Sequence, residues 1–173
     1  MLSREEILEY LRRIGEELSA QGLRGEILLT GGAAMCLVHS ARDTTKDIDA
    51  LYEPKSVINR IAAQLAERGN LPVGWLNDGV KGFLTPNAPF EEFIALDGLI
   101  VQSVSADYLL AMKLMAARYG EKDYEDIRFL LNKLGIKTVK EAFEIVQTYF
   151  SQNQILPKTG YIIEEIIADL TQE

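Results

Sequence analysis

Residues 28–52 read LLTGGAAMCLVHSARDTTKDIDALY, and the order of apolar, glycine and acidic residues in this segment indicates the fold. An apolar run ends in the pair Gly31 and Gly32, and the small and apolar residues after it favour a short helix. The stretch closes on Asp47 and Asp49, which flank a single isoleucine. In a strand, successive side chains point to opposite faces, so both carboxylates would share one face of a sheet. The segment therefore predicts strand, glycine turn, helix and strand in succession.

The spacing of the two acids indicates what they would do. At about 3.4 Å per residue, the Cα atoms of Asp47 and Asp49 would lie roughly 7 Å apart. Carboxylates at that separation can converge on one divalent cation, and an incomplete oxygen site suits Mg²⁺ (or Mn²⁺) with substrate phosphates. Gly31 and Gly32 allow a ligand to approach the backbone closely, and N–H groups that open a helix favour an anion. The pattern predicts a site for a metal-bound phosphate compound.

The remaining sequence predicts an α/β fold with a mixed sheet and a C-terminal helical bundle. Apolar periodicity, capping residues and turn residues predict strands at 26–30, 47–52, 90–96 and 99–104, and helices at 3–19, 31–40, 56–68, 106–119, 122–133, 139–150 and 161–170. Residues 70–89 have no periodicity. We expect an α/β core with an N-terminal helix over 1–104 and a helical region over 105–173, packed on the core or continuous with it.

A second group of charged residues lies in the expected helical region. Lys113 has apolar neighbours in a leucine-rich helix, and a buried lysine is costly unless it meets an anion. Asp123 and Asp126 are three apart and would share one side of the next helix. Together with Arg118, near the end of the first of these helices, these residues could border one cleft. The alternatives are a snorkelling lysine and solvated acids at a helix start.

Composition excludes several function classes. The formal net charge of −8 argues against a protein that coats nucleic acid nonspecifically, although a local basic pocket is compatible with it. One histidine makes a histidine-based triad improbable, and one cysteine allows no internal disulfide and fits the cytoplasm. No run approaches the roughly 18 apolar residues of a membrane span. The charged N-terminus does not have the pattern of a secretory signal.

Together these motifs resemble the nucleotidyltransferase superfamily, which has a DNA polymerase β-like fold. Gly31-Gly32 resembles its first motif, and the segment RDTTKDID (42–49), which begins at Arg42, is similar to the second motif of abortive-infection toxin nucleotidyltransferases. The Lys113 helix and the following KDYEDI resemble their third and fourth motifs. The segment WLND (75–78) also resembles an uncharacterised bacterial family of that superfamily. The similarity spans roughly residues 25–150, with one or two extra residues between the glycines and Asp47, and with Gly32 where the toxins often have serine.

The resemblance implies a Mg²⁺-dependent transfer of a nucleotidyl group from an NTP such as ATP. Asp47 and Asp49 would bind metal, Lys113 would hold phosphate, and Asp126 or Asp123 would assist catalysis. Gly31, Gly32 and Arg118 would contact the nucleotide, with Arg42 and Asp78 as further candidates. The acceptor would be a tRNA, a protein or a small molecule, and the setting a toxin–antitoxin or phage-defence system with an antitoxin-like partner. The alternatives are a non-catalytic partner-binding module and a metal-dependent phosphohydrolase.

Overall fold

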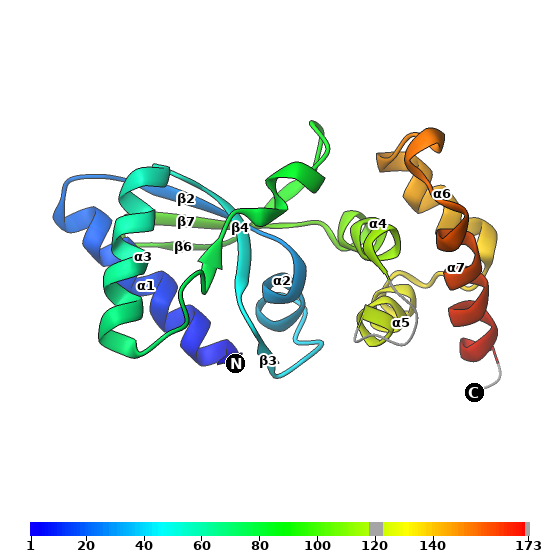
Figure 1. The fold of residues 1–173 in the computed structure, drawn as a ribbon, viewed down its shortest axis with the longest axis horizontal. Helices are drawn as coiled ribbons and strands as arrows, with labels where there is room; N and C mark the ends of the chain where they lie inside the picture. The colour runs from blue at the N-terminus through cyan, green and yellow to red at the C-terminus, as the bar shows by residue number, and fades with distance from the viewer. Residues whose placement is uncertain (118–122, 172–173) are drawn as a thin grey trace. The chain divides into compact units, whose positions relative to one another are not determined.

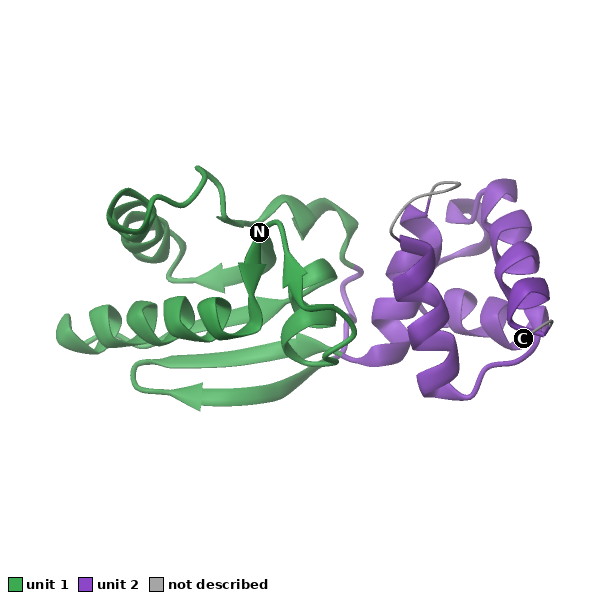
Figure 2. Cartoon of the chain, turned by 90° about the horizontal axis from the view of Figure 1, so that it is seen from below, with its two compact units in different colours: residues 1–84, 90–104 green, residues 85–89, 105–173 purple. Residues whose placement is uncertain are grey.

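The computed structural model describes residues 1–117 and 123–171. The chain forms two compact units (Figure 2), which we describe separately. Unit 1 contains residues 1–84 and 90–104, and unit 2 contains residues 85–89 together with the chain from Ser105 onward. The chain therefore passes between the units at three places. The expected mixed α/β fold is confirmed.

Unit 1 is built on a five-stranded mixed sheet with the order β5-β4-β2-β7-β6 (Figure 1). The strands are β2 (Gly25–Leu29), β4 (Ile48–Glu53), β5 (Leu76–Asn77), β6 (Phe90–Leu96) and β7 (Leu99–Val104). The central strand β2 runs antiparallel to β4 and parallel to β7. This arrangement brings the two ends of the 28–52 segment side by side in the sheet.

The helices of unit 1 cover one face of this sheet. They are α1 (Arg4–Ala20), α2 (Gly31–Leu37) and α3 (Lys55–Gly69). The expected capping box is present at the start of α1, where Ser3 Oγ accepts from the N–H of Glu6 and the Glu6 carboxylate accepts from the N–H of Ser3. The buried apolar face of α1 packs with α3 against inward side chains of the sheet such as Ile27, Ile48 and Val101.

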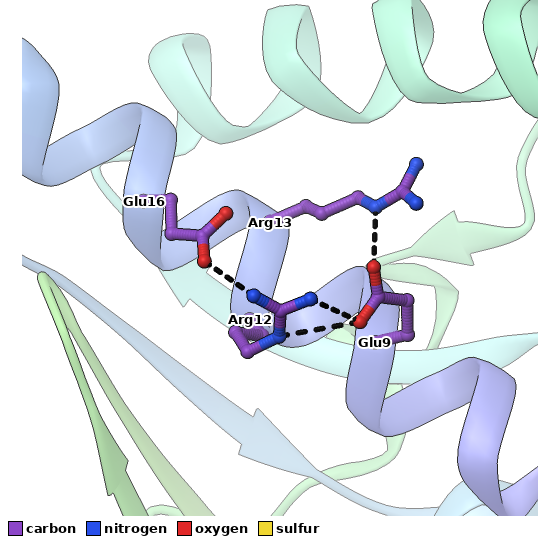
Figure 3. Close-up of polar contacts among 4 residues, drawn as sticks. All are labelled: Glu9, Arg12, Arg13 and Glu16. Atoms are coloured by element: carbon purple, nitrogen blue, oxygen red, sulfur yellow. Dashed lines mark hydrogen bonds and ion pairs between the residues drawn. The ribbon is translucent and has the colours of Figure 1, made fainter.

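The outer surface of α1 carries a chain of ion pairs (Figure 3). Arg12 contacts Glu9, and its Nη1 lies 2.6 Å from Glu16 Oε1, while Arg13 Nε donates to Glu9 Oε1 at 2.7 Å. These residues are three or four apart and about half exposed, so water screens each pair and its contribution to stability is small. The network therefore marks the solvent face of α1 and adds little to its stability.

Unit 2 is helical. Its helices are α4 (Ala106–Ala116), α5 (Asp123–Leu134), α6 (Val139–Tyr149) and α7 (Pro157–Leu170), and α4 packs against the other three. The expected capping box at the start of α6 is present, between Thr138 and Glu141. The apolar faces of these helices form a core of their own, which includes Leu110, Leu130, Val146 and other buried side chains.

Some element boundaries differ from the prediction. Helix α7 begins at Pro157 rather than at residue 161, because proline is well suited to the first helical position. Helix α2 ends at Leu37, three residues early, and Ser40 then takes a positive φ of 52°. Helix α4 ends at Ala116 and not at residue 119 as predicted, because Ala117 already has an extended backbone with a ψ of 144°. The predicted start of the next helix, at residue 122, lies outside the described residues.

Three very short strands were not predicted. Strands β1 (Leu2–Ser3) and β3 (Thr44–Thr45) pair with each other, and β5 extends the sheet beside β4 within the irregular segment 70–89. Two-residue strands leave no periodic pattern to read. Within the described residues, the helices lack the combination of length and apolar character that crossing a membrane requires.

Candidate functional site

The first candidate site lies where β2 ends and α2 begins, next to β4. Gly31 has a φ of +54°, which side-chain-bearing residues rarely adopt. A Cβ built on Gly31 would be 3.2 Å from Oδ2 of Asp49. The carboxylate of Asp49 therefore lies directly against the glycine backbone, and glycine is needed there for conformation and for space.

Thr30 joins the same two segments through its backbone and its side chain. Its N–H and its hydroxyl both donate to the backbone oxygen of Asp49, each at 3.0 Å. Thr30 occupies the N-cap position of α2, yet its side chain makes no cap hydrogen bond to the helix. Because this fully buried hydroxyl is directed to Asp49, it leaves the first N–H groups of α2 uncapped by Thr30.

The two acids flank Ile48, but only Asp49 belongs to the strand, which was predicted to begin at residue 47. Asp47 lies just before β4, and Asp49 is the second residue of that strand. Ile48 between them is fully buried, whereas both aspartates are partly exposed. Their oxygens are hard donors of the type that Mg²⁺ prefers, so the residues fit such an ion. Within the described part of the chain, no third His, Cys, Asp or Glu completes a metal-binding group with them.

Gly32 is confined as tightly as Gly31. A Cβ there would be 2.5 Å from Thr45 Oγ1 and 3.4 Å from Arg42 Nη2. Thr45 is buried and donates to the backbone oxygen of Asp47 at 3.2 Å. The structure thus gathers Gly31, Gly32, Arg42, Asp47 and Asp49 in one region of unit 1.

A neighbour of Asp49 was missed by the sequence reasoning. In the parallel pairing of β4 with β5, Asn77 is the register partner of Asp49. The Asn77 side chain accepts from the N–H of Gly79 at 3.0 Å. Only the register of a two-residue strand reveals this neighbour, and the sequence contains no signal for that register.

Asp78, a secondary candidate, has a local partner. Its carboxylate forms an ion pair with Lys55, the first residue of α3, and this hydrogen bond lowers the pKa of Asp78 and raises that of Lys55. The pair ties the loop after β5 to the start of α3. Both groups are solvent-exposed, so the pair is best read as a surface link between these segments.

The second candidate group lies entirely within unit 2. Lys113 Nζ is 2.7 Å from Asp123 Oδ1 and 2.7 Å from Asp126 Oδ2. The side chain of Lys113 is 12% exposed and that of Asp126 only 6%. The predicted anion that meets this buried lysine is therefore supplied by the first turn of α5. The cluster joins α4 to α5, and Arg118 lies outside the described residues.

A further polar group in unit 2 was not anticipated. Asp107 accepts from Ser105 Oγ and from Tyr149 Oη. Burial acts to raise the pKa of Asp107, but the hydrogen bonds from Ser105 and Tyr149 together lower it. Burial and the hydrogen bond to Asp107 raise the pKa of Tyr149 to about 12. Because these groups anchor α6 to the start of α4, we assign them a structural role.

Comparison with known proteins adds no identification. No protein-family description matches the sequence, and no curated protein matches it. The functional argument therefore depends on the geometry of the residues themselves.

Proposed function

We propose that the chain is a Mg²⁺-dependent nucleotidyltransferase whose central site is the Gly31–Asp49 region of unit 1. One observation carries this proposal. The Asp49 carboxylate lies against Gly31, at the start of a helix whose first N–H groups receive no cap from Thr30. A negatively charged side chain and a set of backbone donors are thus adjacent, and a metal-bound triphosphate needs both kinds of group.

The sequence resemblance supports the same assignment. It links a diglycine turn, paired aspartates and a later lysine helix with nucleotidyl transfer. Helix α2 has only seven residues, so its dipole is small, and the backbone donors matter chiefly because Gly31 and Gly32 permit close approach. The acceptor in this proposal is a tRNA end, a protein hydroxyl or a small molecule.

In this proposal the residues of the site have separate roles in metal binding and in phosphate orientation. Asp47 and Asp49 would hold the ion, and water and triphosphate oxygens would complete its shell. Bound Mg²⁺ supplies charge neutralisation at the phosphates and activates the attacking oxygen. The N–H groups after Gly31 would orient the phosphates, so most of the rate enhancement would come from positioning and electrostatics. In unit 2, Asp123 and Asp126 hold the Lys113 ammonium, and the phosphate contact that the resemblance implies for Lys113 is kept as a separate proposal.

Mutation of the acid pair tests the proposal. Asp47→Asn and Asp49→Asn, separately and together, should abolish Mg²⁺-dependent incorporation of labelled NTP into an acceptor from cell lysate. Asp43→Asn is the matched control, because Asp43 is an exposed acid of the same loop and should leave incorporation unchanged. Circular dichroism and thermal unfolding would show that each variant folds.

Two results would reject the assignment. Undiminished incorporation in the folded Asp47→Asn/Asp49→Asn variant would show that the two acids are not part of the catalytic site. Release of free phosphate without nucleotide addition by the unmodified chain would instead identify a phosphohydrolase.

A further inference from the structure

The uncovered face of the unit 1 sheet combines aliphatic and acidic side chains. Because side chains alternate along each strand, the residues between the buried ones point away from α1 and α3. Figure 2 shows the helices of this unit on one side of its long strands. The side chains that define this open sheet face are Glu26, Leu28, Leu51, Glu92, Ile100 and Gln102.

The register places these side chains in two rows. One row runs Leu51, Leu28, Gln102 and Glu92 across four adjacent strands. The next row places Glu26 between Glu53 and Ile100. Aliphatic side chains on β4, β2 and β7 therefore lie beside carboxylates, with Glu26 on the central strand β2 and Glu92 on the edge strand β6.

The middle of the face is accessible although it lies on central strands. Ile100, on the second strand from the edge, is 41% exposed, while Val101 beside it is fully buried. Leu28 and Leu51, which pair across the two strands, are partly exposed. Apolar side chains in such positions are normally covered, and an exposed apolar surface rimmed by polar groups is typical of an interaction site.

The charges on this face are not balanced. Strands β2, β4, β6 and β7 contain no lysine or arginine. Glu26 and Glu53 are direct partners in an antiparallel pair, where like charges are destabilising. Within the described residues, no cation lies at ion-pair distance from Glu26 or Glu92. A partner that brings positive charge would relieve this repulsion.

We propose that the open sheet face binds a helical segment of another protein that has an aliphatic stripe flanked by lysine or arginine. The stripe would cover Leu28, Leu51 and Ile100, and the basic side chains would reach Glu26 and Glu92. Amphipathic helices bind apolar surfaces in this way through residues spaced three and four apart. The proposal goes beyond nucleotidyl transfer, although Asp49 shares this face of β4 with Leu51, so the docking surface adjoins the proposed site.

Charge selects this occupant over the other candidates. A second copy of the chain would bring acid against acid, since the chain carries a net charge of −8. Nucleic acid and anionic lipid would be repelled for the same reason. A basic amphipathic helix would cover the aliphatic side chains and would also pair with Glu26 and Glu92.

Calorimetry with a designed probe tests the proposal on the full chain, without nucleotide or Mg²⁺. The probe is a helical peptide with leucine on one face and lysine on the flanks, and its control is a peptide of the same composition in scrambled order. We expect the first peptide to bind at least tenfold more tightly. Equal binding of both peptides would overturn the proposal, because it would show charge attraction alone.

Two pairs of variants locate the surface. Glu26→Lys/Glu92→Lys should weaken binding at least tenfold, and Ile100→Ser should weaken it without changing charge. The matched control Glu67→Lys/Glu164→Lys makes the same charge change at exposed helix positions and should cost much less. An equal loss in the control pair, or binding of single-stranded DNA or anionic vesicles by the chain in the absence of the peptide, would contradict the assigned surface.

Discussion

The Asp49 carboxylate lies against the backbone of Gly31, where a Cβ would be 3.2 Å from Oδ2. The same two segments are joined by two hydrogen bonds from Thr30 to the Asp49 backbone oxygen. The end of β2 and the start of β4 are therefore held together at the point where the proposed site lies. Neither residue can change without disturbing the other.

Gly31→Ala should both destabilise unit 1 and disturb the site. The positive φ alone costs roughly 1–2 kcal/mol for a residue with a side chain. Gly22→Ala is the matched control, because Gly22 has a φ of +66° but a Cβ there meets nothing within 4 Å. Chemical denaturation should give similar losses of unfolding free energy from backbone strain, whereas Mg²⁺-dependent NTP binding should fall only in Gly31→Ala. Equal binding in both variants would contradict the close contact.

Lys113→Met should destabilise unit 2 strongly. The substitution removes the ammonium that lies 2.7 Å from the Asp126 carboxylate, whose side chain is 6% exposed, and the loss of this buried ion pair should cost about 2–4 kcal/mol. Lys133→Met, at an exposed position of α5, should change the free energy of unfolding by less than about 0.5 kcal/mol. Denaturant unfolding monitored by circular dichroism measures both.

A double variant separates this ion cluster from simple loss of packing. In Lys113→Met/Asp126→Asn the carboxylate that contacted the Lys113 ammonium is removed as well. The loss of unfolding free energy in the double variant should therefore be clearly smaller than the sum of the losses in the two single variants. Additive costs would show that Lys113 and Asp126 do not act together.

Tyr149 should titrate later than an ordinary tyrosine. Burial and the Asp107 carboxylate raise its pKa from 10.0 to about 12 in the folded chain. The folded state then holds this proton more tightly than the unfolded state, so the contribution of Tyr149 to stability is complete below pH 10 and is lost as the pH rises toward about 12. Ultraviolet absorbance titration of the chain, with Tyr149→Phe as reference, measures the pKa. A difference titration centred near pH 10 would refute the Asp107 contact.

Trp75, the single tryptophan, should emit as a buried indole. It is 2% exposed, and its Nε1 donates to the backbone oxygen of Ala62 at 3.0 Å. Its emission should be blue-shifted and resistant to iodide quenching. Trp75→Phe leaves that oxygen without its donor and should cost about 1–3 kcal/mol of unfolding free energy. Strong quenching by iodide would place the indole in solvent instead.

Much of the local structure could be predicted from sequence. The capping pairs Ser3–Glu6 and Thr138–Glu141 predicted the starts of two helices, because the residues of a capping box are only three positions apart in the sequence. Strands β6 and β7 and the turn at Gly98, with its φ of +68°, followed from alternation and from Asp-Gly chemistry. These signals act over a few residues, so the sequence alone contains them.

The long-range features could not be predicted in the same way. The partner of Lys113 was expected to be an anion, yet its identity as two carboxylates of α5 depends on how α4 and α5 pack. The register of Asn77 beside Asp49 depends on a loop anchored by buried Trp75. Such pairings join residues ten to thirty positions apart, and many alternative packings would satisfy the same local patterns.

Backbone periodicity and sterics within a few residues account for the succession of strands and helices and for the glycine before α2, and they predict that Asp47 and Asp49 share one side. The packing of each unit places Asp49 against Gly31, pairs Lys113 with Asp123 and Asp126, and leaves Glu26, Leu28 and Ile100 on the sheet face away from α1 and α3. Those outcomes depend on which surfaces are buried together, and burial is a property of the whole fold.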